Sequence, residues 1–190
     1  MVSVLVERGA ALKEWAAVVK ALESGTQILI LRKGGIREDG FSSEAGAFFL
    51  YPTGFHQTPE KLRPEYRHFL DKAMSEKPPE GQIRIASFGR VAESFAVSSQ
   101  EKLAALAEEY VCTPDEMKER YEFRPGESLT ALTVRVFRLP QPIEIPVRTK
   151  YGGCVSWVNL EDSISTENAE PALTDSKFDQ RLTRVRSLLR

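Results

Sequence analysis

Two cations followed by two glycines form the first stretch able to carry out chemistry. Arg32 and Lys33 end a run of apolar residues and directly precede Gly34 and Gly35. Cationic side chains favour a bound anion, and glycine lets backbone N–H groups approach a ligand closely. The stretch therefore indicates a binding site for an anionic group such as phosphate. The alternative is a solvated turn with charged ends.

The segment 51–57 brings several kinds of polar and aromatic side chain onto one loop, namely Tyr51, Thr53, Phe55, His56 and Gln57. Such a set can stack on a nucleobase, or another flat polar ligand, and hydrogen-bond to its edge. His56 is also a candidate general base, because an unperturbed imidazole titrates near neutral pH. In that role it would work with Lys33, which would stabilise developing negative charge. The alternative is a Pro/Gly loop with Phe55 packed into the core.

The third stretch is Ser156 and Trp157, which follow a Gly-Gly pair at 152–153. Here Ser156 could hydrogen-bond to a ligand and Trp157 could stack on it, although Trp157 also suits a core position. We expect strands at 27–31, 48–51 and 153–160 to end at one face. The three stretches would then meet in one pocket.

Composition limits the class of protein. The chain has 190 residues, with 26 Lys and Arg against 27 Asp and Glu, for a net charge of −1. A protein that coats nucleic acid non-specifically is normally basic, so any anion site here must be local. With two Cys, two His and no phosphate-loop, dinucleotide or zinc-hydrolase motif, we expect neither a metal ion nor a cofactor.

Nothing in the sequence suggests a membrane segment. The longest apolar run, residues 28–31, is far shorter than the roughly 20 residues that span a bilayer. The first residues lack the apolar run of a signal peptide. We therefore predict a cytoplasmic protein without a membrane contact.

The pattern of apolar residues and caps predicts an α+β chain. Two capping boxes, Ser98 with Glu101 and Thr113 with Glu116, predict helix starts, the second reinforced by Pro114. Apolar spacing and turn residues predict helices at 10–24, 60–75, 99–111 and 114–121, and strands at 27–31, 48–51, within 82–97, at 130–139, at an edge at 143–147, and at 151–160.

The last thirty residues differ from the rest. We predict a single α+β domain at 1–160, an acidic linker at 161–176, and a basic amphipathic helix at 177–190. The helix either packs back on the domain, with its arginines at the end that the helix dipole favours, or contacts a protein partner or nucleic acid.

Three strings, ALKEWAAVVKALESGTQILILRKGGIRE, FFLYPTGFHQ and YGGCVSWVNL, resemble a conserved prokaryotic family of unknown function that is found largely in cyanobacteria. The resemblance covers most of residues 10–160. It implies no activity.

The segment LESGTQILILR at 22–32 is, more distantly, similar to the opening of ASCH domains in the PUA-like superfamily, where a helix leads into a G-x-K-x-x-E-x-R strand. Gly25 and Arg32 match this pattern, while Gln27 and Ile30 replace its Lys and Glu. Residues 83–160 also resemble EVE-type domains. The resemblance implies a small mixed β-barrel of about five to seven strands with flanking helices, to which the C-terminal helix is added.

PUA-like domains commonly bind RNA or modified bases, and some ASCH proteins hydrolyse amides of modified nucleosides with that Lys and Glu, which are absent here. The sequence leaves three functions open. The first is a binding module for RNA or a (modified) nucleotide, through a pocket at one end of the barrel. The second is a hydrolase acting on a nucleoside, nucleotide or nucleic acid with His56 as general base. The third is a protein-interaction or regulatory domain that works through residues 177–190.

Overall fold

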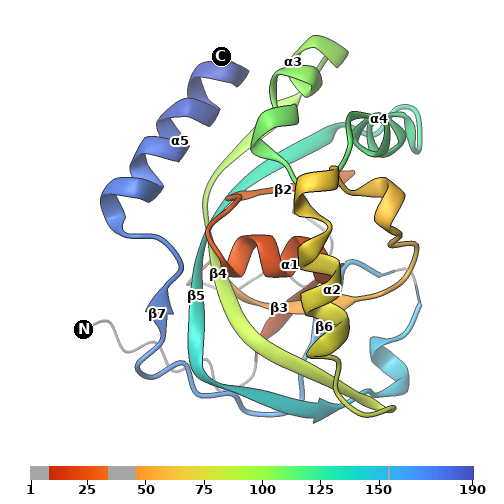
Figure 1. The fold of residues 1–190 in the computed structure, drawn as a ribbon, viewed down its shortest axis with the longest axis vertical. Coiled ribbons are helices and arrows are strands. Elements are labelled where there is room, and N and C mark those ends of the chain that lie inside the picture. The colour runs from red at the N-terminus through yellow and green to blue at the C-terminus, as the bar shows by residue number, and fades with distance from the viewer. Residues whose placement is uncertain (1–8, 34–45, 154) are drawn as a thin grey trace.

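A computed structural model describes residues 9–33, 46–153 and 155–190. These residues form one seven-stranded sheet and five α-helices (Figure 1). The strands are β1 (Ala10–Trp15), β2 (Leu29–Lys33), β3 (Ala47–Thr53), β4 (Gln82–Val97), β5 (Leu129–Pro146), β6 (Trp157–Asn159) and β7 (Glu170–Pro171). The helices are α1 (Ala16–Glu23), α2 (His68–Ser75), α3 (Gln100–Ala105), α4 (Pro114–Glu122) and α5 (Asp175–Leu189).

The sheet is strongly curled. Its order is β2-β5-β4-β3-β1-β6, with β7 beside β5, and only the β1–β3 pair is parallel. The long strands β4 and β5 pair with register shifts between Ile85 and Ser87 and between Val91 and Glu93. Such bulges bend a strand, and β4 and β5 curve around α1 (Figure 1).

The curl brings the two ends of the sheet together without closing it. Arg32 on β2 donates a hydrogen bond to the backbone carbonyl of Lys13 on β1. Among the described residues, however, no ladder joins β2 to β1 or β6. The predicted α+β class with a small mixed barrel and a C-terminal helix is confirmed, and the barrel is open.

Strand alternation divides the buried side chains between two cores. On β3, Phe48 and Leu50 join a core with α1, whereas Phe49 and Tyr51 join a second core on the other face. Successive side chains of a strand point to opposite faces, so a strand buried on both sides is apolar at every position. The uninterrupted run at 48–51 has this pattern, and the predicted strand there is confirmed.

The prediction of one helix over 10–24 is wrong in its first part. Residues 10–15 form β1, which pairs with both β3 and β6, and the helix begins only at Ala16. Ala11 faces the second core and Leu12 the first, as alternation requires. An apolar-rich run buried on both faces can imitate helical spacing, and here sheet pairing prevails over the local pattern.

Several other boundaries also differ from the predictions. A helix was predicted over 60–75, but two short 3-10 turns precede α2, because Pro59 and Pro64 interrupt the α-helical hydrogen bonds. The helix predicted at 99–111 ends at Ala105 and is followed by a 3-10 turn. The strand predicted at 151–160 is reduced to 157–159.

The predicted capping chemistry agrees closely with the structure. The Thr113 hydroxyl accepts the backbone N–H of Glu116 at the start of α4. The other cap lies one residue later than predicted, since Ser99 accepts the N–H of Lys102. In β5, the prolines at 140 and 142 fall where pairing with β4 jumps between its two halves, which is where a sheet tolerates proline.

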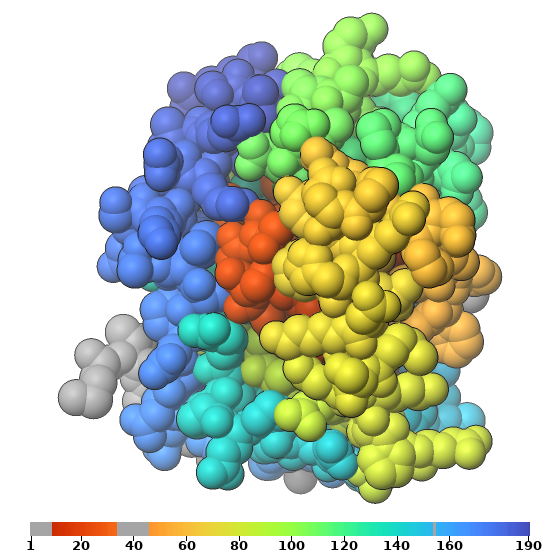
Figure 2. Space-filling model, in the orientation of Figure 1, coloured from red at the N-terminus to blue at the C-terminus, as the bar shows by residue number. Residues whose placement is uncertain are grey.

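The C-terminal segment lies against the rest of the chain. Between residues 161 and 174, Ile164 and Thr166 are buried and β7 pairs with β5. Helix α5 buries its apolar face, made of Phe178, Leu182, Val185 and Leu189. Figure 2 shows α1 visible only between this segment and the α2 region. Of the two arrangements left open for the helix, the structure shows packing on the domain.

Among the described residues, no helix combines the length and the apolar character needed to cross a bilayer.

A substitution at Gly89 in β4 tests how closely the sheet packs against the core. A Cβ atom at this position would lie 2.4 Å from Val134 Cγ1 and 3.3 Å from Phe48 Cζ. Because such crowding forces neighbours to move, we expect Gly89→Ala to lower the free energy of unfolding by about 1–3 kcal/mol in urea denaturation. Gly54→Ala, where a Cβ has no neighbour within 4 Å, is the matched control. Equal effects of the two variants would contradict the close approach.

Candidate functional site

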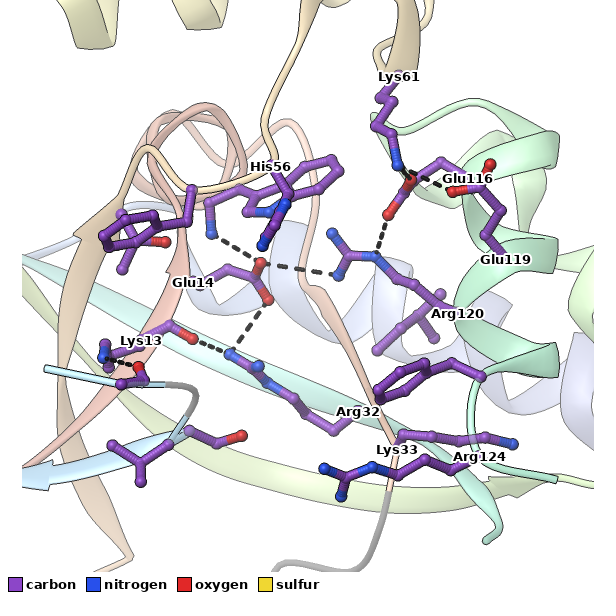
Figure 3. Close-up of a pocket in the computed structure, with 18 residues that line it drawn as sticks. Lys13, Glu14, Arg32, Lys33, His56, Lys61, Glu116, Glu119, Arg120 and Arg124 are labelled. Atoms are coloured by element: carbon purple, nitrogen blue, oxygen red, sulfur yellow. Dashed lines mark hydrogen bonds and ion pairs between the residues drawn. The ribbon is translucent and has the colours of Figure 1, made fainter. Parts of the chain in front are cut away.

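A cleft of about 660 Å³ opens where the ends of β1, β2 and β3 meet α4 and two loops (Figure 3). Clefts of this size are typical of small-molecule sites. It is lined by Lys13, Glu14, Trp15, Leu31, Arg32, Lys33, Thr53, Phe55, His56, Lys61, Glu116, Glu119, Arg120, Phe123, Arg124, Gly153, Val155 and Ser156.

The structure brings all three sequence stretches to this cleft. Six of the predicted residues line it, namely Arg32, Lys33, Thr53, Phe55, His56 and Ser156. Arg32 and Lys33 end β2, Thr53 ends β3 and is followed by Phe55 and His56, and Ser156 directly precedes β6. The structure therefore places residues from all three segments at one cleft, as the sequence analysis expected.

Three predicted residues have other surroundings, and two lie outside the described residues. Tyr51 is buried in the second core, edge-on to Tyr151, and burial raises the pKa of its phenol. Trp157 packs edge-on against Phe48. The Gln57 side chain accepts the backbone N–H of Ala17 and so satisfies the first turn of α1. The two predicted residues that lie outside the described part of the chain are Gly34 and Gly35.

At the centre of the cleft is Glu14, which the sequence analysis did not single out. Its side chain is only 2% exposed. Oε1 accepts the backbone N–H of Trp15 at 2.7 Å and lies 3.7 Å from Nη1 of Arg120, while Oε2 lies 3.4 Å from Nη2 of Arg32. A buried carboxylate needs such partners, because an isolated buried charge is very costly. Because side chains alternate along a strand, Glu14 points to the same side of β1 as Leu12. The helix predicted over 10–24 concealed this alternation, which was the one sequence signal that could have indicated Glu14.

Arg120 connects Glu14 to helix α4. Its Nε donates to Oε1 of Glu116 at 2.9 Å, its Nη1 donates to the Tyr110 hydroxyl at 3.3 Å, and its guanidinium lies 4.4 Å from the ring centre of Trp15. Burial alone would lower the pKa of Arg120, but the neighbouring Tyr110 and Glu14 outweigh it and hold the pKa well above its ordinary value. The guanidinium is therefore a permanent positive charge in the wall of the cleft.

Lys61 continues the same network towards solvent. Its ammonium donates to Glu116 at 2.6 Å and to Glu119 at 2.8 Å. These hydrogen bonds, the one to Glu116 first, raise the pKa of Lys61. The α4 wall of the cleft is thus a chain of alternating cations and carboxylates.

Lys13 fixes the opposite wall. Its ammonium donates to the backbone carbonyls of Tyr151 at 2.7 Å and Gly153 at 2.9 Å, and its backbone N–H donates to the carbonyl of Ser156 at 2.8 Å. One residue of β1 therefore positions the segment that contributes Ser156 to the cleft.

The cleft is positively charged overall, although the chain is not. Among the residues that the structure describes, six cationic residues line it against three carboxylates, whereas the whole chain has a net charge of −1. Its mouth also has exposed apolar side chains: Phe55 is 75% exposed, Phe123 59% and Val155 49%. This combination suits a ligand with both a negative charge and a flat or apolar group.

Strained backbone occurs at the same mouth. Of the three non-glycine residues with positive φ in the described part of the chain, His56 (φ 60°) and Arg124 (φ 50°) line the cleft. Left-handed backbone is disfavoured for such residues, and it concentrates at functional sites. Figure 3 shows His56 extending into the cleft.

Among the described residues, no group of three or more His, Cys, Asp or Glu is arranged so that it could hold a metal ion.

Comparison with known proteins identifies a family. No curated protein matches the sequence. Crystal structures of an ASCH protein from Zymomonas mobilis are similar to this chain. A serine-to-alanine variant shares 14% identity at a TM-score of 0.49, covering 95% of this chain and 97% of that chain. A second structure shares 15% identity at a TM-score of 0.47, covering 92% of each chain. The model of a domain of unknown function, DUF1802, matches residues 11–184, and the chain belongs to that family.

Proposed function

We propose that the cleft binds RNA or a nucleotide. The observation that supports this most is the surplus of cations in a cleft whose mouth has exposed aromatic side chains. Aromatic rings stack on bases regardless of sequence, and cations hold the phosphates. Phe55 and Phe123 are the rings available for stacking.

Two cations at the mouth are best placed to meet phosphate. Lys33 donates to the backbone carbonyl of Glu127 at 2.7 Å and lies over the Tyr121 ring, and Arg124 lies 3.6 Å from the Glu127 carboxylate. Arg124 is 60% exposed. Arg32 and Arg120, by contrast, lie against the buried carboxylate of Glu14 deeper in the cleft. A ligand would therefore place its phosphate at the mouth.

The double variant Lys33→Ala/Arg124→Ala tests the proposal. We expect about a thirtyfold loss of affinity for single-stranded oligoribonucleotides, since each of the two lost phosphate contacts is worth on the order of 1 kcal/mol. The slope of log affinity against log salt should fall by about 1.4, or about 0.7 for each contact. Fluorescence anisotropy over a salt series measures both quantities.

The control for that experiment is Lys118→Ala/Arg138→Ala, which removes the same two charges from exposed positions outside the cleft. If both double variants weaken binding equally, the effect is one of net charge. The cleft would then not be the binding site.

The position of His56 favours a second candidate, a hydrolase acting on a nucleoside, nucleotide or nucleic acid. His56 is held in left-handed backbone and lines the same cleft as Lys33 and Thr53. In this reaction His56 would take a proton from water, and Lys33 would stabilise the negative charge that develops.

For this candidate, His56→Asn is the informative variant. Asparagine tolerates left-handed backbone, so the loop should keep its shape while the imidazole is removed. We expect turnover of a ribonucleotide or oligoribonucleotide substrate to fall at least about 100-fold, with unchanged urea denaturation. Retained turnover would exclude His56 as the base.

A further inference from the structure

We propose that the floor of the cleft selects a base with an imide edge, as in uracil, through Glu14, Arg32 and Arg120. This inference rests on the proposed nucleotide binding. Beyond that proposal, the inference names the base that the cleft prefers and the orientation in which the nucleotide binds.

The first observation is an incomplete hydrogen-bond set on Glu14. Oε1 already accepts from the Trp15 backbone, but Oε2 has no hydrogen-bond partner within the described part of the chain. The side chain is 2% exposed and lines the cleft. A buried acceptor without a partner is costly, so Oε2 is suited to receive one N–H or O–H from a ligand.

The second observation is that guanidinium groups lie on both sides of this carboxylate. Arg32 approaches Oε2 at 3.4 Å, and Arg120 approaches Oε1 at 3.7 Å (Figure 3). Each guanidinium has five N–H donors, and only some of them are used here. Arg32 Nε is buried without an acceptor among the described residues. The floor therefore offers one acceptor without a hydrogen-bond partner, Oε2 of Glu14, and a guanidinium donor on each side of that carboxylate.

The complement of that pattern is an edge with an acceptor, a donor and an acceptor. Uracil has it, since its N3–H lies between the O2 and O4 carbonyls. Guanine presents an acceptor followed by two donors, O6, N1–H and the amino group, so its amino group would face the second guanidinium, a donor against a donor. Cytosine and adenine place a ring nitrogen acceptor at the centre, facing Glu14, and two acceptors repel each other. The floor thus matches uracil best of the four bases.

The charges of the cleft fix the orientation of the ligand. With its imide edge on Glu14, the base would lie between the floor and the exposed rings at the mouth, and the phosphate would face Lys33 and Arg124. The deeper arginines would then contact neutral carbonyl oxygens, which do not compete with their carboxylate partners.

The decisive experiment changes the ligand, so the wild-type protein is used and no folding question arises. Isothermal titration calorimetry compares uridine 5′-monophosphate with its N3-methyl and C5-methyl derivatives, and with the cytidine, adenosine and guanosine monophosphates. We expect uridine monophosphate to bind about tenfold or more tightly than the other three, as one well-placed base contact allows. N3-methylation should abolish that preference, and C5-methylation should preserve it.

The protein variants Glu14→Gln and Glu122→Gln provide the second test. Glu14→Gln should bring the ratio of uridine to cytidine affinity close to one, while Glu122→Gln, exposed on the same helix as Arg120, should leave it unchanged. A general loss of stability would lower both affinities without changing their ratio.

The outcomes separate the two proposals. Binding of all four nucleotides with equal affinity, or unchanged binding after N3-methylation, would overturn the base preference and leave the nucleotide site standing. A preference for cytidine, adenosine or guanosine would do the same. If no nucleotide and no oligoribonucleotide binds, the proposed function fails, and the base preference fails with it.

Discussion

Replacing Arg120 with alanine is expected to lower the free energy of unfolding by about 3–5 kcal/mol, the usual cost of breaking a buried ion pair from one side. Arg120 is 17% exposed and bonds to Glu116, which is 5% exposed. Its removal also takes away the guanidinium that lies both over Trp15 and beside Glu14. Urea denaturation at neutral pH measures the change.

Two further variants make that result specific. Arg120→Lys keeps the charge but loses the planar fork that reaches Glu116, Tyr110 and Trp15 together, so it should give an intermediate loss. Lys118→Ala removes a cation that is 58% exposed on the same helix, and should change stability by no more than about 0.5 kcal/mol. A loss below about 1 kcal/mol for Arg120→Ala would show that the network does not depend on it.

Replacing Lys13 with methionine should have the next largest effect, a loss of about 3 kcal/mol. Methionine keeps an unbranched stem of similar length, but two hydrogen bonds from a charged donor are lost, each worth about 1.5–3 kcal/mol. Because those bonds hold the carbonyls of Tyr151 and Gly153, the wall that carries Ser156 should loosen as well. Unfolding in urea gives the first quantity, and the rate of tryptic cleavage after Lys150 reports the second.

The control for Lys13 is Lys72→Met, which removes an ammonium that is 58% exposed and 4.0 Å from Glu76. It should change neither stability nor cleavage after Lys150. If Lys13→Met lowers stability without faster cleavage, the ammonium stabilises the fold but does not position the wall.

The two variants test different parts of one site. Arg120 holds the wall formed by α4, and Lys13 holds the wall that contains Tyr151, Gly153 and Ser156, with Glu14 between them on β1. Neither variant by itself decides which ligand binds. The nucleotide series and the Glu14→Gln variant do that.

Some structure could be predicted from short stretches alone. The Thr113 cap, with Pro114 after it, set the start of α4, because a cap acts within a single helical turn. The apolar run at 48–51 predicted a strand buried on both faces, because side chains alternate residue by residue. The stretches around Arg32, His56 and Ser156 were recognisable from residue types that suit anion and base binding.

Elements that depend on distant partners could not be predicted in the same way. Residues 10–15 have helical spacing but form β1, since β3 and β6 pair with both of its edges. Tyr51 and Trp157 had suitable chemistry for the site, yet the curl of the sheet turns both towards cores. Gln57 lies beside His56 but caps α1 instead of lining the cleft.

The sequence by itself determined the α+β class, the helix caps, the main strands, and the local nature of any anion site in a chain of net charge −1. Only the tertiary structure decided that Glu14 is buried between Arg32 and Arg120. Caps and alternation depend on neighbours within a few residues. The surroundings of Glu14, in contrast, depend on how the curled sheet brings β1 and β2 together and places α4 against them, and those contacts join residues far apart in the chain.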